Sequence, residues 1–229
     1  LVDASDRIMA VLGGVPPGSK GPEWQSVLQG LNAALARCSE GSTFTSKETS
    51  HPRGGFTARA TGIGYGGGRQ VPGNVKISGE VNQAEMQKLM LDSNMLRVIG
   101  FSNSLFNSFS HKMYCEYKET LTDHLARDPR LRSTSPSTVF AATTVNLGPQ
   151  TTTPPHIDAG NLAHGWCTDT AAGDFDPDKG GHLVLWNLRL VIRFPPGSTI
   201  LFPSALITHS NIPVSSRETR YSIIQYSAG

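Results

Sequence analysis

The stretch Thr152-Thr153-Pro154-Pro155-His156-Ile157-Asp158-Ala159-Gly160-Asn161 decides how the rest of the chain is interpreted. His156 and Asp158 are two residues apart, so on an extended strand both side chains point to the same face. An imidazole nitrogen and a carboxylate oxygen then lie side by side, with room for a third ligand of a metal ion. The stretch predicts part of a metal site, or else an ordinary surface turn.

Length and composition restrict the class of protein. The chain has 229 residues, of which 38% are hydrophobic, with 24 glycines and 15 prolines. This length favours one domain with a real core, and the many turn formers favour a β-rich or α+β domain over a helix bundle. Cys38, Cys115 and Cys167 are too few and too scattered for a disulfide framework, and they suit a reducing compartment. No apolar run predicts a membrane span, and the net charge of +2 does not by itself indicate nucleic-acid binding.

The first part of the chain is predicted to hold the helices. Residues 1–22 are interpreted as a loose arm. Residues 23–37 carry an apolar stripe at helical spacing, which predicts an amphipathic helix packed on the core. Residues 82–127 predict two or three more helices, ending near Asp128-Pro129 because the residue before a proline disfavours the helical conformation.

Residues 40–79 are polar and glycine-rich. They predict a flexible connector or, as the functional alternative, a substrate-facing loop. In the second case Arg59, Arg69 and Lys76 are available for phosphate contacts. The glycines lack the spacing of a P-loop, so a nucleoside triphosphate is not indicated.

After Pro136 the sequence changes to short β segments separated by turns. The predicted strand segments are 137–147, 180–192, 199–202, 206–209 and 220–226. Such a run is typical of a jelly roll or double-stranded β-helix. We therefore predict an α+β fold in a single catalytic domain over residues 1–229. Residues 1–137 would form a helical and Gly-rich loop layer, and residues 138–229 a double-stranded β-helix core.

His209, at the end of an apolar segment, is the candidate third ligand. Two histidines and one carboxylate on one side of an ion, with the other side open, are the ligand set of non-haem Fe(II) oxygenases. Arg220 and Ser222 follow on one face of the last predicted strand. An arginine fork binds a carboxylate through two bonds and a neighbouring hydroxyl donates to the same group. This pair suits the far carboxylate of 2-oxoglutarate, whose keto-acid end would chelate the iron.

Other polar residues near the motif are given ordinary roles. His164 and Cys167 are left out of the ligand set because an oxygenase needs open positions on its metal. Arg217 competes with Arg220, but only Arg220 lies within the predicted strand. A group of aspartates lacks the spacing of a calcium loop and is interpreted as a solvated insert; it comprises Asp169, Asp174, Asp176 and Asp178.

These motifs resemble the Fe(II)/2-oxoglutarate-dependent dioxygenases, and more closely their TET/JBP branch. The resemblance covers residues 50–229 and rests on His156-Ile157-Asp158-Ala159-Gly160-Asn161, Gly180-Gly181-His182-Leu183-Val184-Leu185-Trp186, Phe194-Pro195-Pro196-Gly197-Ser198, His209-Ser210-Asn211 and Arg220-Tyr221-Ser222. It implies Fe(II), 2-oxoglutarate and O2 as cofactors, with iron held by His156, Asp158 and His209. It further implies that Arg220 and Ser222 hold the co-substrate and that His182 contacts its keto-acid carboxylate.

The same resemblance implies a substrate and a place for it. Asn161 matches a residue that bonds an extruded base, Tyr226 matches an aromatic that stacks on it, and Asn74 is a further candidate contact. The expected activity is oxidation of the methyl group of 5-methylcytosine in DNA to 5-hydroxymethylcytosine, in the nucleus, with further oxidation left open. Ala228 stands where animal relatives have a base-contacting histidine, so N6-methyladenine demethylation is an alternative. Hydroxylation of a protein or small molecule, and a non-catalytic binding module, also stay open; the oligomeric state is not predicted.

Overall fold

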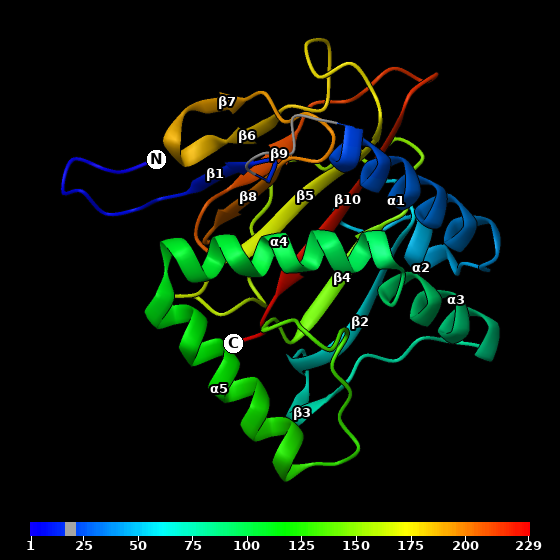
Figure 1. Ribbon diagram of the computed structural model, residues 1–229, viewed down its shortest axis with the longest axis vertical. Helices are drawn as coiled ribbons and strands as arrows, with labels where there is room; N and C mark the ends of the chain where they lie inside the picture. The colour runs from blue at the N-terminus through cyan, green and yellow to red at the C-terminus, as the bar shows by residue number, and fades with distance from the viewer. Residues whose placement is uncertain (17–21) are drawn as a thin grey trace.

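The computed structural model describes residues 1–16 and 22–229, which form two antiparallel sheets with helices packed on one side (Figure 1). The large sheet has seven strands in the order β1-β8-β5-β10-β4-β2-β3, and the small sheet has three in the order β7-β6-β9. The helices are α1 (Pro22–Glu40), α2 (Ser46–Thr49), α3 (Glu80–Met90), α4 (Ser93–Phe109), α5 (His111–Arg127) and the 3-10 turn η1 (Trp186–Leu188). The strands are β1 (Val11–Gly14), β2 (Ala58–Gly66), β3 (Arg69–Asn74), β4 (Ala142–Asn146), β5 (Cys167–Asp174), β6 (Leu183–Leu185), β7 (Leu190–Ile192), β8 (Thr199–Phe202), β9 (His209–Asn211) and β10 (Thr219–Tyr226).

The long helices follow the apolar periodicity of the sequence. The stripe predicted over 23–37 is α1, which buries Trp24 and Leu31 against the sheet. Residues 80–127 hold three helices, and α4 begins where the Asp92 carboxylate accepts a hydrogen bond from the Asn94 backbone N–H at 2.9 Å. The last of them, α5, ends at Arg127, before Asp128-Pro129 as predicted. Among the described residues, no helix combines the length and the apolar character needed to cross a membrane.

Strand β10 separates two cores because its side chains alternate between the faces of the large sheet. Tyr221 and Ile223 pack on one face against α1, α3 and α4, and Figure 1 shows α1 and α4 lying across this face. Arg220, Ser222 and Ile224 point to the other face, towards the small sheet. One strand therefore supports the helical layer and lines a cavity between the sheets.

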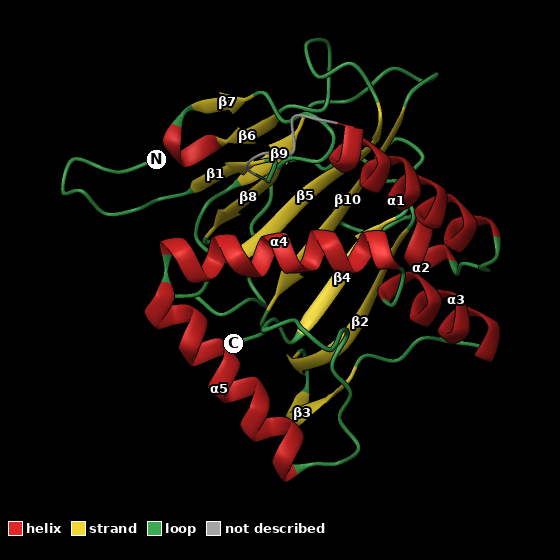
Figure 2. Cartoon of the chain, in the orientation of Figure 1, coloured by secondary structure: helices red, strands yellow, loops and turns green. Residues whose placement is uncertain are grey.

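The small sheet packs on the large one through a second apolar core. This core joins Leu183 and Leu185 of β6 to residues of β5 and β8, including Ile200 and Phe202. Figure 2 shows the small sheet as a separate group of strands near β1 and β8. Two antiparallel sheets facing each other, with helices on the outer side, confirm the predicted α+β fold with a jelly-roll core.

The first 137 residues contain strands that the sequence did not predict. Within the predicted loose arm 1–22, β1 pairs with β8 through Val11 and Leu201; residues 17–21 lie outside the described residues. Within the predicted loop 40–79, β2 pairs with β4 and forms a hairpin with β3. The prediction failed because alanine and glycine, which have low strand propensity, occupy five of the 9 positions of β2. Gly62 shows the reason for them, since its φ is +99° and a Cβ there would collide with the Ala141 carbonyl oxygen.

The prediction of a strand over 206–209 was wrong by several residues. The backbone N–H groups of Leu206 and Ile207 both donate to the Pro203 carbonyl, so this segment is a turn. The strand that follows, β9, begins at His209 and pairs with Leu185 of β6. His209 thus opens a strand instead of ending one.

An aromatic cluster joins α4 and α5 to the residues before β4 and supports a stability prediction. Phe106 of α4 is fully buried and stacks on Phe140 with ring centroids 5.2 Å apart. Removing the ring leaves a cavity, so Phe106→Ala should lower the free energy of unfolding by about 3–5 kcal/mol. Phe109→Ala, on the exposed side of the same helix, should change it by about 0.5 kcal/mol or less. Urea unfolding measures both, and equal losses in the two variants would contradict the packing described.

Candidate metal centre

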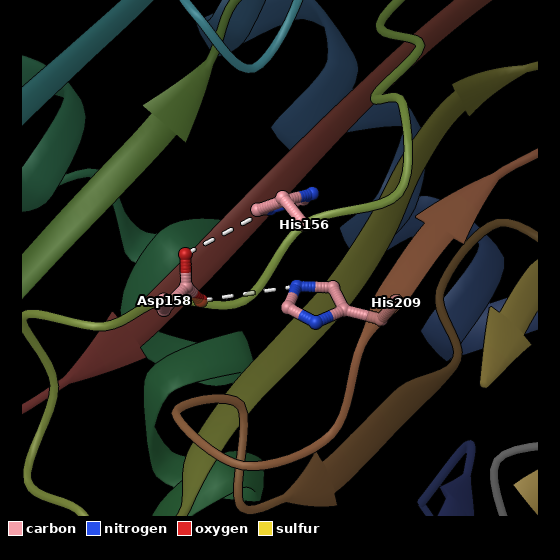
Figure 3. Close-up of side chains that lie close together, drawn as sticks. All are labelled: His156, Asp158 and His209. Atoms are coloured by element: carbon pink, nitrogen blue, oxygen red, sulfur yellow. Dashed lines mark ion pairs between the residues drawn. The ribbon is translucent and has the colours of Figure 1, made fainter. Parts of the chain in front are cut away.

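The three predicted ligands lie together between the sheets (Figure 3). Their ligand atoms are all within 4.8 Å of one another. His156 Nε2 is 3.8 Å from Asp158 Oδ1, and His209 Nε2 is 3.8 Å from Asp158 Oδ2. Figure 3 shows both rings turned towards the one carboxylate, so the three groups can bind one cation.

Backbone pairing brings the two parts of this triad together. The His156 N–H donates to the His209 carbonyl at 3.0 Å, and the His209 N–H donates back at 2.9 Å. The Asp158 N–H donates to the Ser204 carbonyl, which fixes the carboxylate beside the histidines. The segment 152–161 is a loop with two isolated bridges, at His156 and Asn161, instead of the expected strand, yet the bridge from His156 to His209 keeps His156 and Asp158 on one side.

Both histidines have the tautomer that a metal ligand needs. His156 Nδ1 donates to the Pro154 carbonyl and His209 Nδ1 donates to the Ile207 carbonyl, each at 2.9 Å. The proton on Nδ1 leaves Nε2 as a free lone pair directed at Asp158. Burial lowers the pKa of His209 below its ordinary value, which favours the neutral form of the ring that binds a cation.

A narrow cavity of about 40 Å³ extends from the triad to Arg220. Arg220 is almost completely buried, and its Nε has no hydrogen-bond partner. Beside it, Ser222 Oγ accepts a hydrogen bond from Asn146 Nδ2 at 2.8 Å, which leaves the hydroxyl proton free to donate. A buried cation with an unused donor, next to a free hydroxyl, fits a carboxylate ligand. The predicted pair Arg220 and Ser222 therefore lies at the closed end of the same cavity as the triad.

Two further polar residues of the cavity were missed or misplaced by the sequence analysis. Asp169 was predicted to belong to a solvated insert, but it lies on β5 opposite Ile224 and lines the cavity. Burial raises its pKa to about 6, partly opposed by the charge of Arg220. Asn146 lies on β4 directly opposite Ser222. No spacing along the chain marks either residue, because their positions depend on which strands pair.

The residues predicted to contact a base lie outside this cavity. Asn161 Nδ2 donates to Ser204 Oγ at 2.9 Å, and its N–H closes a turn onto the Asp158 carbonyl. The Tyr226 hydroxyl accepts a hydrogen bond from Thr144 Oγ1, and its ring packs against the core between the sheets. Both side chains thus have structural partners, and their contact with a base stays a prediction.

Three other predicted contacts are also distant from the triad or engaged elsewhere. Asn74 bonds the Arg130 carbonyl and the Arg132 N–H, so it ties β3 to the loop after α5. His182 precedes β6, where its carbonyl accepts a bond from Ile212, and it does not line the cavity. Arg59 is not available for phosphate, since it is buried in an ion pair with Glu48.

The exclusions made from the sequence agree with the structure. His164 pairs with Glu116 on the surface at 3.0 Å. Cys167 lines the cavity, but burial raises the pKa of its thiol, so the thiolate that binds metals is disfavoured. Arg217 is exposed in a turn and does not reach the cavity. The ligand set remains His156, Asp158 and His209.

Comparison with solved structures identifies the fold. NgTET1, solved in complex with 5mC DNA, matches with a TM-score of 0.62 at 12% sequence identity, over 99% of this chain and 74% of that chain. A prolyl-4-hydroxylase from Pseudomonas putida matches at 12% identity over 96% of this chain and 91% of its own, with a TM-score of 0.45. A 2OG-Fe(II) oxygenase family oxidoreductase from Burkholderia pseudomallei matches at 16% identity over 93% and 92%, also with a TM-score of 0.45.

At the level of the fold, the predicted resemblance is confirmed. No protein-family model and no curated protein sequence matches the chain. The likeness to NgTET1 extends over nearly the whole chain, which shows a shared fold despite the low identity. Together with the His-Asp-His triad, this fold fits Fe(II), 2-oxoglutarate and O2 as the cofactors.

Removal of one protein ligand of the metal should strongly weaken Fe(II) binding while the protein stays folded. We expect His209→Ala to weaken Fe(II) binding by more than about 100-fold, because loss of partners outside the ligand set already costs 10–100-fold. His164→Ala, a surface histidine paired with Glu116, is the matched control and should bind normally. Anaerobic titration and metal analysis of both variants provide the measurement. Normal Fe(II) binding by His209→Ala would place the metal elsewhere.

The pKa of Asp169 predicts a pH-dependent stability. Its pKa is raised from 3.8 to about 6, so between these values the native state binds more protons than the unfolded state. The Asp169 contribution to stability is therefore present at low pH and is lost as the pH rises through about 6. Asparagine does not titrate, so the stability of Asp169→Asn relative to wild type should increase between about pH 4 and pH 7. Urea unfolding of the metal-free proteins tests this, and a difference independent of pH would refute it.

Proposed function

We propose that the protein is an Fe(II)/2-oxoglutarate-dependent dioxygenase that oxidises the methyl group of 5-methylcytosine in DNA to 5-hydroxymethylcytosine. The observation that carries the proposal is the triad with two free Nε2 atoms, in one cavity with the buried Arg220. Bound iron would supply O2 activation, coupled to oxidation of 2-oxoglutarate to succinate and CO2. The residues of the chain supply binding, orientation and exclusion of water.

Five residues of the cavity have a definite task in this proposal. His156, Asp158 and His209 would hold the iron from one side and leave its other positions for 2-oxoglutarate and O2. Arg220 and Ser222 would bind the far carboxylate of the co-substrate, which fixes the direction of its keto-acid end. Because Arg220 is almost completely buried, this ion pair forms away from water and is strong.

Two observations support a methylated base as the substrate. NgTET1, which shares the fold, was solved in complex with 5mC DNA. The chain also forms a backbone bridge between Asn161 and Ala228, the two positions that the sequence resemblance assigns to base contacts.

The test uses oligonucleotides that carry either 5-methylcytosine or N6-methyladenine. With Fe(II), 2-oxoglutarate and O2, the wild type should convert 5-methylcytosine to 5-hydroxymethylcytosine, measured by mass spectrometry of nucleosides. Asp158→Ala should reduce the product by at least about 100-fold, since it removes a direct metal ligand. His164→Ala should retain activity, because its side chain lies on the surface against Glu116.

The other outcomes identify a different substrate. Conversion of N6-methyladenine alone would replace the base, an option that Ala228 leaves open. Turnover of 2-oxoglutarate with unchanged DNA would favour a protein or small-molecule substrate instead. Absence of any Fe(II)-dependent turnover would leave a binding module with this fold. A nuclear location is also part of the proposal, and it rests on the sequence resemblance alone.

A further inference from the structure

A second arginine, Arg53, lines the cavity of the metal site. It comes from the segment between α2 and β2, far in the sequence from the motifs that form the triad. Arg53 is half-buried, whereas Arg220 is almost completely buried at the other end of the cavity. The cavity therefore has a cation at its closed end and a second cation at the side that reaches solvent.

The turn that carries Arg53 is held firmly against the metal loop. His51 and Gly54 exchange two backbone hydrogen bonds, of 3.1 and 2.9 Å. The His51 Nε2 interacts with the Phe56 carbonyl at 3.1 Å, and the two rings pack edge to face with centroids 4.8 Å apart. A Cβ at Gly54 would collide with the Thr152 carbonyl oxygen, so the turn contacts the segment that leads to His156.

In the part of the chain that the structure describes, the charge of Arg53 takes part in no ion pair. Within residues 1–16 and 22–229, no acidic side chain lies within ion-pair distance of its guanidinium. The two carboxylates of the cavity have other associations, since Asp158 faces His156 and His209, and Asp169 interacts with Arg220.

We propose that Arg53 binds a phosphate group of the DNA substrate at the mouth of the metal cavity. This inference rests on the proposed function, and it assigns a residue that the sequence motifs do not contain. The co-substrate has two anionic ends, one suited to Arg220 and the other to the metal, so a third cation is left for the substrate. A base drawn into the cavity brings its phosphates to the solvent side, where Arg53 lies. The guanidinium fork matches a phosphate in shape and charge.

The test compares Arg53→Gln and Arg53→Lys with the wild type and with Arg217→Gln. Arg217 is an exposed arginine outside the cavity and serves as the matched control. Binding of a 5-methylcytosine oligonucleotide is measured by fluorescence anisotropy at several salt concentrations. The KM for 2-oxoglutarate is measured from succinate formed in the absence of DNA. Circular dichroism verifies that each variant is folded.

We expect Arg53→Gln to weaken DNA binding by about tenfold and to reduce the slope of log Kd against log salt by about 0.9, the value for one lost phosphate contact. Arg53→Lys should keep the slope but recover only part of the affinity, and Arg217→Gln should behave as the wild type. The KM for 2-oxoglutarate should change by less than about twofold, since co-substrate affinity comes from Arg220 and the metal.

Two results would overturn the role of Arg53. A raised KM for 2-oxoglutarate with an unchanged salt slope would assign Arg53 to the keto-acid carboxylate of the co-substrate. No change in either quantity would make it an ordinary solvated cation. Both results are measured as differences between the variants and the wild type. Failure of the proposed function is measured in the wild type itself, which would then neither bind nor oxidise methylated DNA. In that case the proposed role of Arg53 fails as well.

Discussion

The metal centre depends on one backbone contact, the pair of hydrogen bonds between His156 and His209. These bonds join a loop to the edge of the small sheet and bring two imidazole rings within 4.3 Å of each other, centroid to centroid. The side chains are then oriented by the nearest carbonyls, of Pro154 and Ile207, which fix both tautomers. Ligand geometry thus follows from the main chain, and little side-chain entropy remains to be lost when a cation binds.

The polar groups at the closed end of the cavity lower the stability of the fold, and apolar packing on the other face of β10 offsets this loss. A buried Arg220 and a neighbouring Asp169 both lose hydration, and Arg220 Nε and Asp169 Oδ1 lack hydrogen-bond partners. The opposite face of the same strand packs Tyr221 and Ile223 into the large helical core. Apolar burial on one face of β10 therefore stabilises the strand although polar groups on its other face lack hydrogen-bond partners. Such unpaired groups are expected at a site that binds a charged ligand.

The sequence predicted those parts of the fold and site that have local signatures. The helical stripe of α1, and the pairs His156–Asp158 and Arg220–Ser222, depend on spacings of a few residues. Asn146 and Asp169 could not be predicted in the same way, because each is placed by pairing with β10 from a distant part of the chain. Strand β2 was missed because alanine and glycine occupy much of it and do not indicate a strand.

The two ends of the cavity are built differently, and this difference explains why the substrate is harder to infer than the cofactors. Arg220 and Ser222 lie on the central strand β10, which pairs with a strand on each side, so their positions are fixed by the sheet. Three candidate substrate positions lie outside the strands: Arg53 between α2 and β2, Asn161 after Asp158, and Ala228 beyond β10. Tyr226 and Asn74 are the last residues of β10 and β3. Turns accept substitution without loss of the fold. The iron chemistry can therefore be common to proteins of this fold while their substrates differ, and the turns are where the substrate of this chain is decided.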